Sequence, residues 1–172
     1  SGVRRVASPN CNPRPVGTLP ELIVVHGISL PQGQFGGANI EALFTNTLDP
    51  GAHPYFAEIG HLKVSAHFLI QRSGEMVQFV STDQRAWHAG VSSWCGREQC
   101  NDFSIGIELE GTDDTLYDEL QYDALITLIE VLRIRYPSIH ADAIVGHDGI
   151  APGRKTDPGP NFEWSRVRQA VQ

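Results

Sequence analysis

The sequence predicts a single α/β domain, residues 1–172, with a central mixed β-sheet flanked by α-helices. Short apolar segments typical of strands alternate along the chain with segments of helical spacing, as in α/β proteins. The length suits one hydrophobic core, since domains commonly contain about 100–200 residues. No internal repeat, low-complexity tract or linker-like composition divides the chain.

Short apolar segments predict the strands, and these are residues 22–26, 64–70, 75–80, 103–110 and 143–145. The second and third segments flank Arg72-Ser73-Gly74, which is typical of a hairpin turn. In the fourth segment apolar residues alternate with others, so one face would carry Phe103, Ile105, Ile107 and Leu109. The opposite face would carry Gly106, Glu108 and Glu110.

The clearest helix is predicted after Asp118, a suitable N-cap with Gln121 as its capping-box partner. It should end before Tyr136-Pro137, and its core stripe consists of Leu125, Leu128 and Leu132. Shorter helices are predicted around Ile40, Leu43 and Phe44 and over residues 162–171. Residues 83–102 are predicted to form a long polar loop, and loops over a sheet often carry functional residues.

Composition excludes several classes of partner. The formal net charge is −7 and the 13 lysines and arginines are scattered, which disfavours nucleic acid. No apolar run approaches the roughly 18 residues of a membrane span. The odd cysteine count favours free thiols in a reducing compartment over a disulfide framework, and a bridge between Cys95 and Cys100 is the alternative. We expect a monomer without nucleic-acid or membrane partners.

Three residues at the ends of predicted elements suit a catalytic zinc ion. His26 ends an apolar strand, His147 follows another, and Asp157 lies in a proline-containing loop ten positions later. Any of the seven histidines taken alone would more often be structural. Together, however, two imidazoles and a carboxylate are a typical catalytic zinc set, which leaves a fourth position for water and lowers the pKa of that water to about 7. Imidazole ligands favour zinc over magnesium or calcium.

A general base must accept the proton of the water. Glu108 and Glu110 are the candidates, and periodicity does not choose between them. Glu108 is the more interior, and the neighbouring Gly106 would leave room for a substrate, whereas a solvated edge position is our expectation for Glu110. Lys155, two positions before Asp157, could stabilise the oxyanion that forms on a carbonyl substrate, although surface charge is the ordinary role of a lysine.

The aromatic and imidazole side chains outside this set could bind a ligand or have a structural role. Trp87-His88 could stack against a sugar ring or a peptide, and a tryptophan is equally often a core residue. Structural roles are expected for His53, His61 and His67.

A series of motifs along nearly the whole chain supports a family resemblance. The motifs are ISLP at 28–31, LDP at 48–50, HPYF at 53–56, VSAH at 64–67, RAWHAGVS at 85–92, CNDFS at 100–104, GIELEGT at 106–112 and RKTDPGP at 154–160. In this order they resemble the AmpD-type 1,6-anhydro-N-acetylmuramoyl-L-alanine amidases, zinc enzymes of bacterial cell-wall recycling. The related fold, shared with peptidoglycan recognition proteins and phage amidases, is a mixed sheet flanked by helices.

The resemblance implies roles for individual residues. The implied zinc ligands are His26, His147 and Asp157, the catalytic residues Glu108 and Lys155, and the substrate contacts Trp87, Tyr55, Lys63 and Leu109. It therefore selects Glu108 over Glu110. The implied reaction is hydrolysis, in the cytoplasm, of the amide between the lactyl group of anhydromuramic acid and L-alanine of a small muropeptide.

Some positions depart from the family pattern. Gly27 replaces a frequent Asn, Lys63 a frequent Arg or Thr, and Gln99 a frequent Arg, all of which bear on substrate contacts. Asp148-Gly149 after His147 is also unusual, although no ligand is lost.

Two alternative functions remain open. A broader amidase acting on intact peptidoglycan outside the cytoplasm would be expected to have a signal peptide and a wall-binding region, and the sequence shows neither. A non-catalytic muropeptide-binding module would be expected to lack a zinc ligand, and this sequence contains the complete set.

Overall fold

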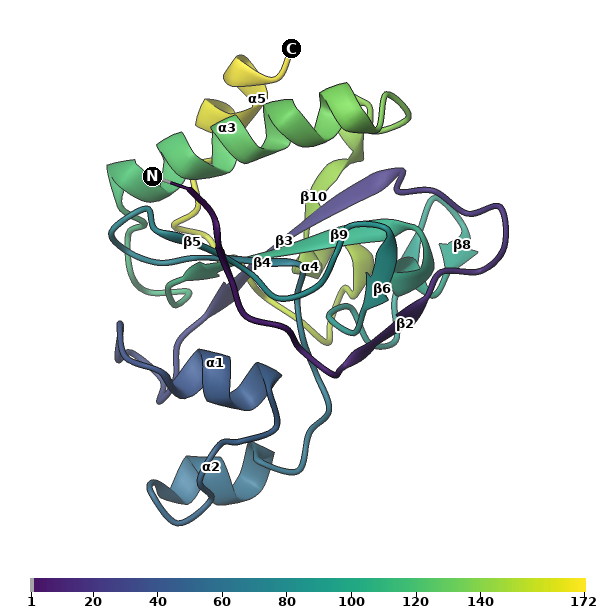
Figure 1. Cartoon of the computed structure of the whole chain (residues 1–172). Coiled ribbons are helices and arrows are strands. Elements are labelled where there is room, and N and C mark those ends of the chain that lie inside the picture. The colour runs from purple at the N-terminus through teal and green to yellow at the C-terminus, as the bar shows by residue number, and fades with distance from the viewer. Residues whose placement is uncertain (1) are drawn as a thin grey trace.

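A six-stranded mixed sheet forms the centre of the computed structural model, which describes residues 2–172 (Figure 1). The strand order is β1 (Arg4–Arg5), β5 (Met76–Gln78), β4 (Phe68–Ile70), β9 (Ser104–Glu110), β3 (Leu22–Ile28) and β10 (Ile144–Gly146). Strands β4, β9, β3 and β10 are mutually parallel, whereas β5 runs antiparallel to β4 and carries β1 on its outer edge. The predicted α/β class with a mixed sheet is confirmed.

Helices cover both faces of the sheet. Their bounds are α1 (Asn39–Phe44), α2 (Pro54–Ile59), α3 (Glu119–Arg135), α4 (His147–Ile150) and α5 (Trp164–Ala170). Figure 1 shows α3 and α5 on one side of the sheet and α1 and α2 on the other. None of the helices formed by residues 2–172 has the length and apolar character that a bilayer crossing requires.

Helix α3 confirms the predicted capping box. The Asp118 carboxylate accepts a hydrogen bond from the Leu120 backbone N–H at 3.0 Å, and the Gln121 side chain accepts one from the Asp118 N–H at 3.0 Å. These bonds satisfy backbone donors that the first turn leaves without helical partners. The leucines of the predicted stripe pack against the sheet in one core cluster, with Ile105, Ile107 and Leu109 of β9.

All five predicted strands form, but their bounds differ. The predictions 64–70, 75–80 and 103–110 are too long, 22–26 is two residues too short, and 143–145 is displaced by one residue. The hairpin forms around Gly74, with Phe68 paired to Gln78, but β4 begins only at Phe68. Phe103 precedes β9 and packs in a different cluster, with Leu22 and Val24. Helix α2 was not predicted, because its start depends on the His53 imidazole, which accepts a hydrogen bond from the Tyr55 N–H at 3.1 Å.

The segment 83–102 is more ordered than the predicted polar loop. It contains β6 (Gln84–Ala86), which pairs with β2 (Cys11–Pro13), and the short ribbon of β7 (Ser93–Trp94) and β8 (Arg97–Glu98). A 3₁₀ helix over Cys100–Asp102 follows, and another covers Ala141–Ala143 before β10. Within residues 2–172 the three cysteines are free thiols.

Candidate active site

The predicted metal ligands and the predicted base meet at the carboxyl ends of adjacent parallel strands. His26 in β3 is the register partner of Glu108 in β9, and His147 begins α4 directly after β10. Asp157 lies in the segment between α4 and α5 and reaches the same point. Crevices at the carboxyl ends of parallel strands are where α/β sheets bind ligands.

His26, His147 and Asp157 form a compact ligand set. The two Nδ1 atoms of His26 and His147 lie 3.0 Å apart, and Oδ2 of Asp157 lies 3.3 Å from the first and 3.1 Å from the second. Both histidines are buried, and the Asp157 carboxylate is 18% exposed. Nitrogen and oxygen lone pairs so close together require a proton or a cation between them, so this donor set fits a metal ion.

The surroundings of the set favour a neutral His26 imidazole and an ionised Asp157 carboxylate. Burial lowers the pKa of His26 to about 4. Burial alone would raise the pKa of Asp157, but hydrogen bonds with His147 and His26 outweigh it, and the net shift is downward. Nε2 of His147 lies 3.1 Å from the Ala89 carbonyl, so it carries the ring hydrogen and leaves Nδ1 free to bind a metal.

Glu108 is placed and desolvated as a general base would be. It is 9% exposed, and its Oε2 has no hydrogen-bond partner among residues 2–172. Burial raises the pKa of Glu108 well above its usual value, as does the charge of Asp157, while Lys155 opposes the rise. Glu108, Lys155 and the three ligands all line one cavity of about 680 Å³. The carboxylate and the ammonium therefore face the same space as the metal set.

Glu110 has a structural role, and our expectation that it would lie on a solvated edge was wrong. Strand β9 is central and Glu110 is 2% exposed. Its carboxylate accepts hydrogen bonds from the backbone N–H groups of Gly36 at 2.6 Å and Arg72 at 3.2 Å. It thereby anchors two loops, and this geometry favours Glu108 as the base.

Gly106 makes room for a side chain of the protein rather than for a substrate. A Cβ atom at this position would lie 2.4 Å from Cγ of His88. The interpretation of Gly106 as a substrate space is therefore corrected, since the His88 imidazole fills that volume.

The four predicted substrate contacts are not equivalent. Tyr55 lines the cavity and is 40% exposed. Lys63 is exposed on the chain between two lining residues, Leu62 and Val64. The Trp87 indole donates a hydrogen bond to Asn12 at 2.7 Å, on an exposed part of the surface.

The predicted role of Leu109 as a substrate contact is wrong. Its side chain is fully buried in the core on the α3 side of the sheet, because alternation along β9 turns it away from the Glu108 face. The side chain therefore has no access to a ligand in the cavity.

Gly27, one of the departures from the family pattern, has a local structural explanation. A Cβ atom at Gly27 would lie 2.4 Å from the Tyr117 hydroxyl, which donates to the Pro158 carbonyl at 2.9 Å. Gly27 thus accommodates a tyrosine that fixes the loop after Asp157. The backbone N–H of Asp148 donates to the Asp157 carbonyl at 3.1 Å while its side chain is exposed.

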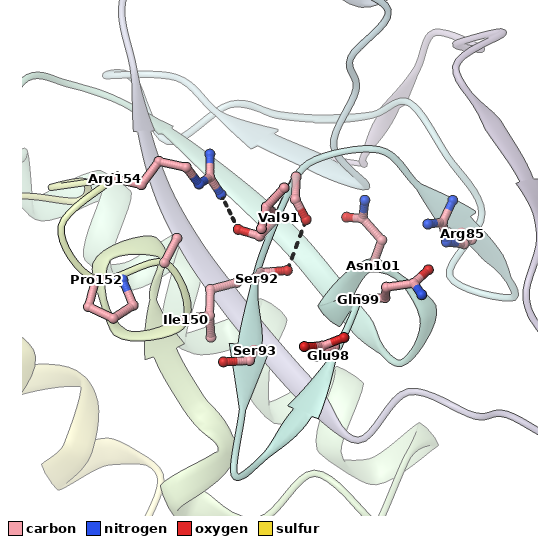
Figure 2. Close-up of a pocket in the computed structure, with 12 residues that line it drawn as sticks. Arg85, Val91, Ser92, Ser93, Glu98, Gln99, Asn101, Ile150, Pro152 and Arg154 are labelled. Atoms are coloured by element: carbon pink, nitrogen blue, oxygen red, sulfur yellow. Dashed lines mark hydrogen bonds between the residues drawn. The ribbon is translucent and has the colours of Figure 1, made fainter.

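Gln99 lines a second cavity, of about 710 Å³ (Figure 2). Arg154 borders both cavities, and its guanidinium donates hydrogen bonds of 2.6 Å to the carbonyls of Ala89 and Val91. Sequence reasoning missed Arg154 and Tyr117. The signals in the sequence were glycines that leave space for these side chains: Gly90 beside Arg154, and Gly27 and Gly111 beside Tyr117.

Two buried imidazoles and a carboxylate beside a desolvated glutamate in an open cavity are typical of metal-assisted hydrolases. The family model for N-acetylmuramoyl-L-alanine amidases matches residues 16–160. The chain belongs to this amidase family.

Several similar proteins within this family have the same name, AmpD. The chain is 61% identical over 168 residues to the 1,6-anhydro-N-acetylmuramyl-L-alanine amidase AmpD of Citrobacter freundii, covering 98% of this chain and 89% of the relative. It is 60% identical to the enzyme of the same name from Escherichia coli, covering 99% and 92%. A crystal structure of a selenomethionine AmpD derivative superposes with a TM-score of 0.96 at 60% identity, covering 99% and 94%.

A more distant structure contains a bound ligand. AmpDh3 of Pseudomonas aeruginosa, in complex with anhydromuramic pentapeptide, matches with a TM-score of 0.70 and 31% identity. The match covers 91% of this chain and 61% of AmpDh3.

Proposed function

We propose that this chain is a zinc-dependent amidase that cleaves the bond between 1,6-anhydro-N-acetylmuramic acid and L-alanine of the stem peptide during peptidoglycan recycling. The convergence of His26, His147 and Asp157 beside Glu108 is the observation that carries the chemistry. The substrate class rests on the AmpD relatives, which match nearly the whole chain, and on the anhydromuramic pentapeptide bound by AmpDh3.

His26 and His147 would hold the zinc ion through Nδ1 and Asp157 through Oδ2. Zinc in such a site acts as a Lewis acid and lowers the pKa of water to about 7. The high pKa of Glu108 suits it to accept a proton from the attacking water near neutral pH and to return that proton to the departing L-alanine nitrogen.

Lys155 has a separate role in the proposed reaction. It is exposed at the cavity, so its ammonium can stabilise negative charge on the carbonyl oxygen of the substrate as the water attacks. Because that charge exists only in the transition state, the interaction would lower the barrier rather than tighten substrate binding.

We place the reaction in the cytoplasm, with a small muropeptide as the substrate. The free thiols of Cys11, Cys95 and Cys100 suit a reducing compartment. Arg154 lines both cavities, which together are large enough for a sugar and a short peptide.

The test is mass spectrometry of the products from three substrates: an anhydromuramyl tripeptide, the same tripeptide with a reducing muramic acid, and cross-linked peptidoglycan. We expect release of the intact tripeptide from the anhydro form with the highest kcat/KM and almost no release from the cross-linked wall. Equal kcat/KM for the first two substrates would contradict the anhydro preference. Binding without any cleavage by the zinc-loaded protein would contradict the amidase function.

A further inference from the structure

A chain of hydrogen-bonding side chains continues from His26 through the half-buried His88 to Ser104. Nδ1 of His26 faces His147 and Asp157, and its Nε2 lies 2.9 Å from Nδ1 of His88. Nε2 of His88 lies 3.0 Å from the Ser104 hydroxyl, at the start of β9. The two imidazole rings meet edge to face, with an interplanar angle of 89°. Nε2 of His26 and both nitrogens of His88 therefore have one polar neighbour each, whereas Nδ1 of His26 faces the ligand set.

The direction of the hydrogen bonds follows from the chemistry of neutral imidazole, which has one donor and one acceptor nitrogen. If Nδ1 of His26 gives its lone pair to a metal, the ring hydrogen must be on Nε2, which then donates to His88. His88 accepts at Nδ1 and donates from Nε2 to Ser104. The chain thus has one consistent arrangement of hydrogens, and that arrangement leaves the His26 lone pair directed at the ligand set.

The position of His88 is determined by its surroundings rather than by His26 alone. Its backbone N–H donates to the Asn101 side chain at 3.1 Å. Its ring occupies the space over Gly106, where a Cβ atom would approach Cγ of His88 to 2.4 Å. Gly106 is itself held by His67, whose Nδ1 accepts the Gly106 N–H at 3.0 Å. The central strand β9 and the Asn101 side chain therefore hold Nδ1 of His88 in the position where it can accept a hydrogen bond from His26.

We propose that His88 is a positioning residue for the metal site: its Nδ1 atom fixes the tautomer and ring orientation of His26 and thereby sets the affinity for zinc. This inference rests on the proposed zinc site. Hydrogen-bond partners of metal-binding histidines typically contribute about 10–100-fold to metal affinity. His88 contacts no reacting atom in this role, and it acts through His26.

The decisive comparison uses two variants of His88. In His88→Asn the side-chain oxygen can take the place of Nδ1 and accept from His26, whereas His88→Leu has a similar volume and no acceptor. The dissociation constant for zinc is measured by competition with a chromogenic chelator on metal-free protein. We expect His88→Leu to weaken zinc binding about 10–100-fold and His88→Asn to stay within a few-fold of wild type.

Controls separate positioning from a general loss of structure. His140→Leu replaces an exposed histidine outside the site and should leave the zinc affinity unchanged. Thermal unfolding of the metal-free variants reports their folding, and the visible spectrum of the cobalt-substituted protein reports ligand geometry. The spectrum should change in His88→Leu and match wild type in His88→Asn.

Several results would overturn the proposal. Wild-type zinc affinity in folded His88→Leu would show that the hydrogen bond is irrelevant, and equal losses in both variants would show that ring packing matters instead. If His88→Leu does not fold, Ser104→Ala takes its place, and that variant must weaken zinc binding several-fold for the proposal to stand. Failure of wild-type protein to bind zinc would contradict the proposed metal site itself, whatever the variants do.

Discussion

At the scale of single residues, two adjacent carboxylates on one strand face have opposite environments. Glu108 has an oxygen without a hydrogen-bond partner in the described residues, whereas both oxygens of Glu110 accept backbone N–H groups. The pKa of Glu108 is raised chiefly by burial. A carboxylate that lacks compensating hydrogen bonds can exchange protons near neutral pH, and one that is fully bonded serves to hold loops in place.

Exchange of Glu108 for glutamine separates chemistry from metal binding. Glu108→Gln should retain zinc and lower kcat by about 10²–10⁴-fold, because an amide cannot accept the proton of the attacking water. Glu110→Gln should lower kcat much less and should destabilise the fold by about 1–3 kcal/mol through its lost hydrogen bonds. Steady-state kinetics on a defined anhydromuropeptide, elemental analysis and urea unfolding measure the three quantities. The reverse order of kcat losses would assign the base role to Glu110.

Lys155 should affect rate and leave the metal in place. Lys155→Met should reduce kcat by roughly 10²–10³-fold with unchanged zinc content, because it removes one donor to charge that develops in the transition state. Kinetics and elemental analysis on the same preparation test this, with Arg5→Met as a control that removes an exposed cation outside the cavity. An unchanged kcat in the zinc-loaded variant would show that Lys155 is only a surface charge.

At the scale of elements, β9 connects the core with the site. Its odd-numbered residues Ile105, Ile107 and Leu109 pack under α3. On the other face, Ser104 and Gly106 contact His88, and Glu108 lies beside His26. His67, which directly precedes β4, supports this strand. Its Nδ1 accepts a hydrogen bond from the Gly106 N–H, and its Nε2 donates one to the Gln84 carbonyl at 3.0 Å. Both ring nitrogens are thus used in the neutral state.

The stability of this arrangement should fall in acid. Burial, together with the Arg14 guanidinium, lowers the pKa of His67 from 6.5 to about 3. Below pH 6.5 the unfolded chain binds a proton at His67 that the folded chain does not. The free energy of unfolding therefore falls by about 1.4 kcal/mol per pH unit for this group, until the folded state also protonates.

His67→Asn tests this pH dependence, since it keeps an acceptor for Gly106 and cannot titrate. Urea unfolding of metal-free protein between pH 7.5 and 4.5 should show a shallower decline in the variant than in wild type, although the variant is less stable at neutral pH. Parallel curves for the two proteins would refute a neutral, buried His67.

At the scale of the whole molecule, the proposed metal site joins three distant segments. Its ligands come from β3, from α4 after β10, and from the loop before α5. A ligand that binds only the folded state stabilises it by mass action. Residues separated by more than a hundred positions in the chain would therefore be held together by one ion.

Removal of the metal should lower the thermal stability. With zinc at about 100 times its dissociation constant, the stabilisation is about 2.7 kcal/mol, which corresponds to roughly 5–10 °C in Tm for a domain of this size. Differential scanning calorimetry with and without a chelator measures the shift. Asp157→Ala should show no zinc-dependent shift, and identical Tm values for wild type under both conditions would contradict a tightly bound ion.

The sequence by itself determined the parts of this protein that depend on local chemistry. The capping box of α3 is set by residues three positions apart, and the strand faces follow from alternation. The meeting of His26 and His147 could also be predicted, because one ends an apolar run and the other follows one, and the ends of parallel strands meet at one edge of a sheet.

Only the tertiary structure decided which partner each side chain meets. It favours Glu108 over Glu110 as the general base, because Glu110 binds backbone N–H groups. It also shows that His88 fills the space over Gly106 and that Leu109 is buried in the core. These outcomes depend on segments that the chain brings together from far apart, such as the contact between Glu110 and Gly36. No periodicity encodes such contacts, because burial and hydrogen bonding across the fold arise only when all the elements have packed.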